Sequence, residues 1–340
     1  MTDQAVVGVV VIGRNEGERL KRCLCSIQEQ HSGPVVYVDS GSTDGSTAYA
    51  RSIGVEVVDL DISIPFTMAR GRNAGLKQLV KKYPQCHFLQ FIDGDCEMVV
   101  DWLHQGVQFL YENQHYGGVC GNRRERFSEI SIYNQLIDME WQGSEGEVQA
   151  CGGDAIYRIE ALQAAGGFNE SMIAGEEADL CLRIREQGFR LMRLDLPMTI
   201  HDADMHHFSQ WWKRSVRCGH AYAHSYDLHR NNHGDGRSGY SGKSLLSSLL
   251  YGLIIPMLVI SLLIVGQLMM GLVVVLLLYG RIVVKAAGSK LNPANSLAQR
   301  LVYGCFTALG KLPESQGAMQ YFANRALGKT SKIIEYKIDH

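Results

Sequence analysis

The chain has 340 residues, and its 33 basic and 35 acidic side chains give a formal net charge of −2. The length favours two domains, and the nearly balanced charge gives no indication of nucleic acid or an acidic polymer as a partner. The nine cysteines show no paired Cys-x-x-Cys spacing. We therefore expect reduced thiols in a cytosolic domain, with neither disulfides nor structural zinc.

Strand and helix patterns alternate from the start of the chain. The apolar run over residues 6–12 is too short to span a membrane, follows no basic region, and predicts a strand buried on both faces. Further strands are expected over 35–38, 55–58 and 88–92, with helices between them. Repeated strand–helix–strand units predict an α/β fold: a Rossmann-like, mostly parallel sheet with helices on both faces.

Two carboxylates follow the apolar strand, in the triplet Asp93-Gly94-Asp95. In extended backbone, residues i and i+2 face the same way, so both acids can lean over one point at the carboxyl end of the strand, where open α/β sheets bind ligands. Gly94 lets a bulky anion approach the backbone closely. Two oxygen ligands on one side suit a divalent cation that also holds a diphosphate, although the same triplet is ordinary turn chemistry too.

An apolar segment near the other end indicates a membrane anchor. Residues 245–284 carry Arg281 as their only charge. Since about 20 apolar residues cross a bilayer once, the segment predicts a transmembrane helical hairpin. Basic residues flank it on both sides: Arg230, Arg237 and Lys243 before it, and Lys285 and Lys290 after it. The positive-inside rule places both flanks in the cytoplasm; a buried core hairpin of a soluble protein is the alternative.

These features divide the chain into four parts. Residues 1–230 are the expected α/β domain, 231–244 a linker rich in Gly, Ser, His and Asn, 245–284 the hairpin, and 285–340 the tail. Apolar residues interspersed with Arg and Lys predict that the tail forms amphipathic helices along the cytoplasmic membrane face. A free cytosolic tail is the alternative.

Several motifs, in this order along the chain, resemble those of family 2 glycosyltransferases. They are Val10–Glu16, Val38–Gly45, Arg72–Gly75, Asp93–Asp95, and Gly166–Glu170 followed by Gly175–Leu180. The resemblance covers about residues 6–217. It implies a GT-A fold, a nucleotide-diphosphate sugar as donor, and a divalent metal, Mn²⁺ or Mg²⁺, as cofactor.

The resemblance also implies roles for residues around the donor. Asp39 is expected to accept a hydrogen bond from the donor base, Arg72 to bring a permanent positive charge near the donor, and Asn73 to hydrogen-bond ribose or sugar. Asp93 is expected on ribose or sugar hydroxyls and Asp95 on the metal. Plainer alternatives are a turn cap for Asp39 and an exposed helix arginine for Arg72.

Residues further along complete the expected site. Gly153 and Asp154 resemble the acceptor-side strand and loop, where glycine leaves room for a sugar and aspartate can bind a sugar hydroxyl or form a turn. His201 best fits the position at which relatives often add a histidine to the metal shell, and His206 is the next candidate. Trp141 is expected in the core rather than on a sugar face.

Glu176 and Glu177 are the candidate catalytic residues, at the expected start of a helix. Successive side chains of a helix diverge by about 100°, so only one of the two can point squarely into the cleft. Glu177 lies three positions before Leu180, so its face of the helix also meets the domain. Glu176 is better placed to complement the positive end of the helix dipole. The family usually has Glu-Asp here, which puts Glu177 at the catalytic position with one extra methylene. We therefore expect Glu177 to be the general base.

Together these expectations describe a membrane-anchored inverting glycosyltransferase at the cytoplasmic face of the inner or plasma membrane. Its acceptor would be a hydroxyl of a lipid-linked molecule, because a hairpin anchor confines enzyme and acceptor to one surface. Two alternatives remain: a polyprenyl-phosphate sugar synthase, and a membrane-tethered nucleotide-sugar binding protein without turnover.

Overall fold

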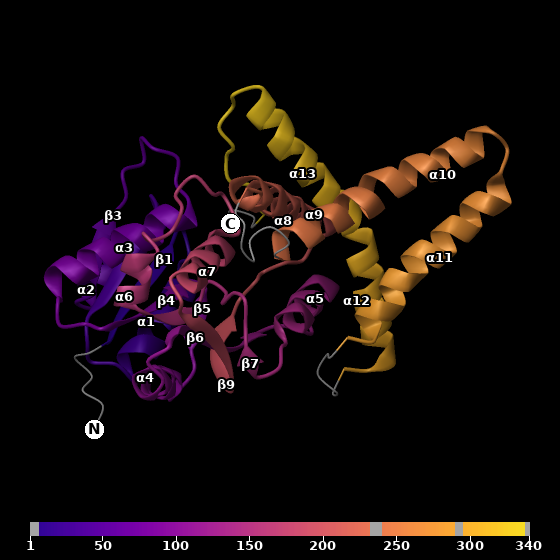
Figure 1. The fold of residues 1–340 in the computed structure, drawn as a ribbon. Helices are drawn as coiled ribbons and strands as arrows, with labels where there is room; N and C mark the ends of the chain where they lie inside the picture. The colour runs from indigo at the N-terminus through magenta and orange to yellow at the C-terminus, as the bar shows by residue number, and fades with distance from the viewer. Residues whose placement is uncertain (1–6, 232–239, 290–294, 337–340) are drawn as a thin grey trace.

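The computed structural model describes residues 7–231, 240–289 and 295–336. They form an α/β domain around one sheet, followed by long helices that project away from it (Figure 1). The described strands make up a nine-stranded sheet in the order β3-β2-β1-β4-β8-β6-β9-β5, with β7 paired to β9.

The first half of the sheet is parallel, as the sequence predicts. Its elements are β1 (Val7–Gly13), α1 (Glu18–Gln28), β2 (Val35–Asp39), α2 (Ser46–Ser52), β3 (Glu56–Asp59), α3 (Met68–Lys82) and β4 (Phe88–Asp93). Apolar residues drive the packing, because α1 buries Leu20, Leu24 and Ile27 at helical spacing and β1 is buried along most of its length. In register, Gly13 lies beside Asp39 and Ile12 beside Asp93, so these strands end at one edge.

The second half of the sheet is mixed. Its elements are β5 (Cys96–Met98), α4 (Trp102–Glu112), β6 (Tyr116–Glu125), α5 (Ile132–Trp141), β7 (Gly146–Glu147), β8 (Ala155–Arg158), α6 (Ile159–Ala164), α7 (Glu176–Glu186) and β9 (Arg190–His201). β8 runs antiparallel to both β4 and β6, whereas β6 and β9 are parallel. The predicted mostly parallel pairing therefore holds for the first four strands of the order. β8 departs from it, because it runs antiparallel between β4 and β6.

Long helices make up the rest of the chain. They are α8 (Phe208–His229), α9 (Tyr240–Leu249), the π-helical segment η3 (Leu250–Ile254), α10 (Ile255–Ile264), α11 (Leu268–Ala287), α12 (Leu297–Leu309) and α13 (Lys311–Ala326). Two continuous helical stretches, Ser241–Ile264 and Leu268–Ala287, are long and apolar enough to cross a membrane. They form the projecting hairpin in Figure 1. Most of the predicted linker, together with Arg237 and Lys290, lies outside the described residues.

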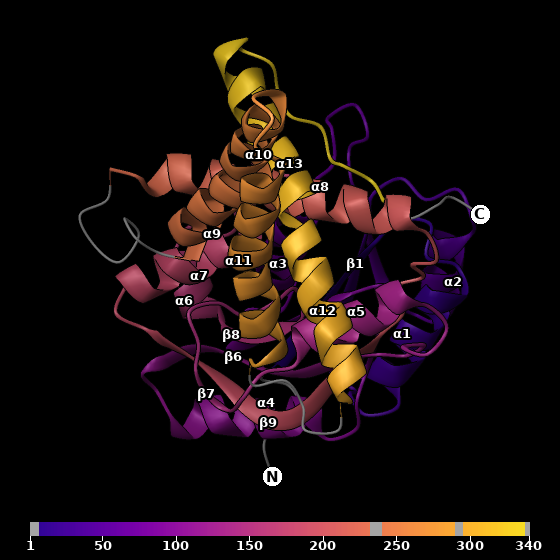
Figure 2. The same cartoon turned by 90° about the vertical axis from the view of Figure 1, so that its right-hand side faces the viewer.

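The tail helices pack against the rest of the protein. α12 lies along α11, and α13 lies along α8, as Figure 2 shows. Glycines allow the second contact, because a side chain at Gly219 would run into the backbone of Glu314 and one at Gly317 into the backbone of Val216. Beyond α13 the chain returns to the α/β domain, where Glu335 pairs with Arg14 at 3.1 Å. The tail thus joins the hairpin to the α/β domain.

The hairpin leads to a topology prediction. If both stretches cross a membrane, their outer ends lie on one side of it and the turn at Gln267 on the other. After replacement of the exposed Cys25 and Cys305 by serine, single cysteines at Asn231 and Ser289 should share one reactivity toward a membrane-impermeant thiol reagent in intact cells. A cysteine at Gln267 should show the opposite reactivity. Different labelling of Asn231→Cys and Ser289→Cys would rule out two crossings.

Candidate active site

Functional side chains gather at the edge where β1, β2 and β4 end. α3 begins at this edge, because a helix that follows a parallel strand starts beside the carboxyl end of that strand. Thr67 caps α3 by accepting a hydrogen bond from the backbone N–H of Arg70. α7 begins nearby with Glu176 and Glu177 in its first turn, where the helix dipole favours carboxylates. β6 and β9 run parallel and end with Glu125 and His201 side by side.

A buried guanidinium group on α3 links carboxylates from two other elements, β4 and α7. Arg72 of α3 is 1% exposed, and its Nη2 donates to Asp93 Oδ1 at 2.9 Å. Its Nη1 donates to Glu176 Oε1 at 2.7 Å and lies 3.3 Å from Glu177 Oε1. Arg72 is thus a buried charge centre rather than an exposed helix arginine. It holds Asp93 and the two glutamates around one point.

The two glutamates differ in their access to solvent. The side chain of Glu176 is 1% exposed and that of Glu177 is 23% exposed. Glu176 Oε2 has no hydrogen-bond partner among the described residues. Burial, with the added repulsion of Glu177, raises the pKa of Glu176 from 4.5 to about 7 even though Arg72 opposes the shift. Of the pair, Glu177 is the one that faces the open side of the cluster.

Gly153 and Asp154 lie behind this cluster. A side chain at Gly153 would meet Arg72 Nη2 at 2.6 Å and Asp93 Oδ2 at 2.9 Å, so the residue gives the backbone close access to both. Asp154 is fully buried. Its Oδ1 accepts from the backbone N–H of Asp93 at 3.1 Å, and its Oδ2 accepts from Thr199 at 2.7 Å and pairs with Arg123 at 2.6 Å. Because Asp154 is buried, it offers no surface to the acceptor sugar that the sequence suggested as its ligand. Asp154 instead holds the backbone of Asp93 in place.

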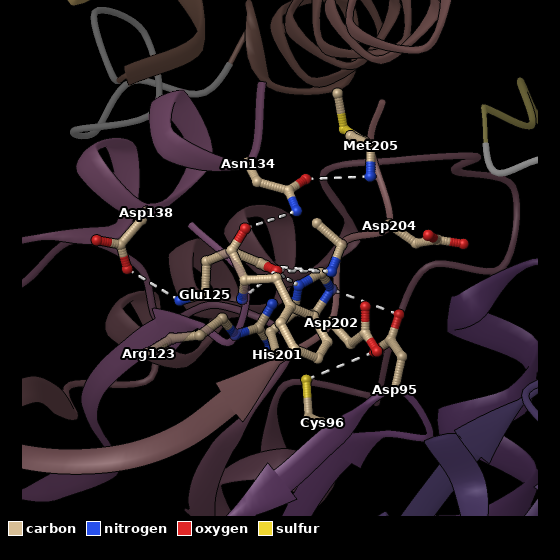
Figure 3. A network of polar contacts seen from close by, with 12 residues as sticks. Asp95, Cys96, Arg123, Glu125, Asn134, Asp138, His201, Asp202, Asp204 and Met205 are labelled. Atoms are coloured by element: carbon tan, nitrogen blue, oxygen red, sulfur yellow. Dashed lines mark hydrogen bonds and ion pairs between the residues drawn. The ribbon is translucent and has the colours of Figure 1, made fainter. Parts of the chain in front are cut away.

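A second group of side chains could hold a metal ion. One ligand atom from each of Asp95, Cys96 and His201 lies within 4.8 Å of the others. Figure 3 shows His201 between two carboxylates: Nε2 is 3.4 Å from Asp95 Oδ2, and Nδ1 is 3.2 Å from Glu125 Oε2. A neutral imidazole can donate from only one ring nitrogen. A cation between Nε2 and Asp95 would therefore relieve the contact, which is the chemistry expected of a divalent metal site.

The remaining predicted donor residues hold loops in place. Asp39 Oδ2 accepts the backbone N–H groups of Gly41 and Ser42, and Oδ1 accepts from the Tyr37 hydroxyl, each at 2.8 Å. Asn73 exchanges hydrogen bonds with the backbone of Phe168, at 2.8 and 2.9 Å. Both residues therefore shape the walls of the site, and their contacts to a donor base, ribose or sugar stay predictions.

Three residues near the site, Arg123, Glu125 and Cys96, were not indicated by any sequence pattern. Arg123 joins Asp154 and lies over the Trp141 ring at 5.1 Å. The Trp141 ring also makes an edge-to-face contact with the His201 ring, with the two centroids 4.7 Å apart. Trp141 therefore borders the candidate metal site as well as packing in the interior. The strands that carry these residues are distant in sequence, so only the Arg-rich end of β6 could have drawn attention to them.

Comparison with known proteins agrees with the fold. Residues 8–166 match the profile of Glycosyl transferase family 2. Glycosyltransferase AglE of Haloferax volcanii is 24% identical over 235 residues, which are 63% of this chain and 71% of that protein. Succinoglycan biosynthesis protein ExoA of Rhizobium meliloti is 28% identical over 171 residues, and the match spans only 51% of its length.

A solved structure shares the fold over most of the chain. It is the mannosyltransferase PcManGT from Pyrobaculum calidifontis in complex with GDP-Man and Mn²⁺, with a TM-score of 0.57 at 17% identity. The alignment covers 94% of this chain and 88% of that one. The fold is that of GT-A glycosyltransferases. The match to glycosyl transferase family 2 over residues 8–166 supports a glycosyltransferase.

The raised pKa of Glu176 leads to a prediction for stability. Because this carboxyl binds its proton more tightly in the folded than in the unfolded chain, its contribution to the free energy of unfolding is present below about pH 4.5 and is lost as the pH rises through about 7. The melting temperature of the wild type should therefore fall relative to that of Glu176→Gln between these pH values. Thermal unfolding across this range measures the difference, with Glu147→Gln on exposed β7 as control. A pH-independent difference would contradict the assignment.

Proposed function

We propose that the protein is an inverting, metal-dependent glycosyltransferase that uses a nucleotide-diphosphate sugar and a lipid-linked acceptor at the cytoplasmic membrane face. The observation that carries the proposal is the meeting of Asp93, Glu177 and Arg72 beside the Asp95–His201 pair. Together they would supply a base, a cation-binding pair and hydroxyl-binding oxygens at one edge of the sheet. These are the groups that sugar transfer from a diphosphate requires.

Asp95 and His201 would hold the divalent cation, Mn²⁺ or Mg²⁺. When bound, the ion would balance the negative charge of the donor diphosphate as it leaves. Carboxylate oxygen suits both ions, and imidazole nitrogen favours Mn²⁺ over Mg²⁺. The mannosyltransferase of similar fold was solved with Mn²⁺. Asp93, which Arg72 and Asp154 orient, is placed to accept hydrogen bonds from donor hydroxyls.

Glu177 would act as the general base. It takes the proton of the acceptor hydroxyl while the hydroxyl oxygen bonds to the anomeric carbon and the bond from that carbon to the diphosphate oxygen breaks. Attack opposite the leaving group inverts the configuration. Partial exposure supports this role, because Glu177 can meet a substrate and Glu176 is enclosed. Glu176 instead helps Arg72 to fix the position of its neighbour.

Apolar surface near the site supports a lipid-linked acceptor. Phe127, Ile130, Ile132 and Phe208 are exposed at the starts of α5 and α8. These two starts lie together, because Ser131 donates to the carbonyl oxygen of Met205, in the loop that follows His201. α12 packs behind them through Phe306, which meets the rings of Tyr133 and Trp211. Apolar side chains therefore lead from the candidate metal site toward the hairpin.

The cytoplasmic orientation rests on basic residues at the ends of the hairpin. Arg230 precedes its first stretch and Lys243 lies in the first turn of that stretch, whereas Arg281 and Lys285 lie in the last turns of its second. Positively charged flanks remain in the cytoplasm. Both flanks, and the α/β domain with them, are expected on that side.

Replacement of the proposed base gives a direct test. Positioned proton abstraction contributes about 10²–10⁴ to the rate, so Glu177→Gln should lose turnover by that order while it keeps donor affinity. Asp95→Asn is the matched variant, and it should lose metal-dependent donor binding and transfer together. Turnover and nucleotide binding are measured on the same preparations. If Glu176→Gln lost transfer while Glu177→Gln kept near-normal turnover, Glu176 would be the base and Glu177 its support.

An acceptor screen tests the substrate class. Purified protein in lipid nanodiscs, with Mn²⁺ and a set of radiolabelled nucleotide-diphosphate sugars, should transfer sugar to a lipid-linked saccharide. Bare polyprenyl phosphate is the competing acceptor. Transfer to the bare phosphate alone, with Glu177→Gln still active, would identify a polyprenyl-phosphate sugar synthase, since a phosphate needs no deprotonation by a base. Donor binding without transfer to either acceptor would favour a binding protein.

A further inference from the structure

Glu125 is a buried carboxylate whose contacts converge on the candidate metal site. It is the last residue of β6, it is 6% exposed, and it lies in register with His201 of β9. Its Oε2 is 3.2 Å from His201 Nδ1 and accepts the backbone N–H of Ala203 at 3.1 Å. Its Oε1 accepts the N–H of Phe127 at 3.3 Å. Figure 3 shows the carboxylate behind the imidazole, on the side away from Asp95.

The arginines on either side of Glu125 in the sequence are engaged elsewhere. Arg124 donates to both carboxylate oxygens of Asp138, at 2.8 and 2.9 Å. Arg126 pairs with Glu97. Among the described side chains, the ion pair found for Glu125 is the one with His201. A buried carboxylate is costly without such a partner, so the imidazole and Glu125 constrain each other.

The contacts of the imidazole favour one placement of its proton. Glu125 Oε2 lies 3.2 Å from Nδ1, nearer than Asp95 Oδ2 lies to Nε2 at 3.4 Å, and a carboxylate can only accept. In the neutral ring with its proton on Nδ1, that N–H donates to Glu125 and the lone pair of Nε2 points toward Asp95. The Trp141 ring meets the imidazole edge-on, with the two planes at 83°, and limits its rotation. His201 is therefore held with one nitrogen ready to bind a cation.

We propose that Glu125 is a positioning residue that holds His201 in the Nδ1-protonated tautomer, so that Nε2 can bind a divalent cation together with Asp95. The proposal rests on the metal site of the proposed function. A carboxylate on the far nitrogen of a histidine ligand orients the ring and raises its basicity, and loss of such a partner typically weakens metal binding about 10–100-fold. Glu125 also binds the Ala203 backbone, so the test must separate ring positioning from support of the loop.

A double-mutant cycle on metal affinity makes this separation. Mn²⁺ is titrated into the full-length protein in detergent, without donor, and free Mn²⁺ is followed by electron paramagnetic resonance. Glu125→Gln keeps the shape, but its amide can donate to Nδ1 and favour the opposite tautomer. We expect about 10–100-fold weaker Mn²⁺ binding in this variant. In a His201→Ala background the same change should cost nothing further, because the ring on which it acts is absent.

Glu97→Gln is the matched control. Glu97 lies on neighbouring β5, where it pairs with Arg22 and Arg126, and its replacement should leave Mn²⁺ affinity unchanged. If Glu125→Gln fails to fold, Glu125→Asp retains the charge with a shorter reach and should still bind Mn²⁺ more weakly than the wild type.

The outcomes distinguish the inference from the function on which it rests. Wild-type Mn²⁺ affinity in folded Glu125 variants, or equal losses from Glu125→Gln with and without His201, would overturn the positioning role. Unchanged affinity in His201→Ala would instead remove His201 from the metal site, and the proposed metal site would need revision. If His201→Ala weakens Mn²⁺ binding, and Glu125→Gln weakens it only when His201 is present, both the metal site and the positioning role of Glu125 are supported.

Discussion

The burial of like charges at one edge of the sheet is the constraint on which the rest of the site depends. Asp93, Asp154, Glu176 and Glu177 come together there, and such a group is stable only if cations or protons offset its repulsion. Arg72 and Arg123 supply the cations from α3 and β6. Removal of either guanidinium would leave buried carboxylates unpaired, which makes both residues structural as well as electrostatic parts of the active site.

This arrangement separates two tasks. Around Arg72, the carboxylates are held by a fixed cation, and Glu177 keeps partial exposure. Around His201, the carboxylates of Asp95 and Glu125 flank the imidazole on its two nitrogens, an arrangement that suits a bound divalent cation. Asp93-Gly94-Asp95 connects the two groups, because its first acid faces Arg72 and its second faces His201.

The helical part of the chain relates the site to the membrane-crossing candidates. α8 follows the loop after His201, and α13 packs on it closely enough to require glycine at 219 and 317. α12 in turn lies between α11 and the aromatic residues of α5 and α8. The loop after His201 is therefore joined to the hairpin by packed helices rather than by a free connection, as the proposed lipid-linked acceptor would require.

The sequence alone determined the parallel first half of the sheet and the apolar hairpin, because each depends on local periodicity. It predicted that Asp93 and Asp95 lean over one point, whereas in the structure Asp93 faces Arg72 and Asp95 faces His201. Only the tertiary structure decided the rest. The antiparallel insertion of β8 buries Asp154, which the sequence suggested as an acceptor contact. The pairing of β6, β9 and β5 puts Glu125, His201 and Cys96 side by side. No local pattern specifies these neighbours, since strand order and side-chain burial arise from packing between segments far apart in the chain.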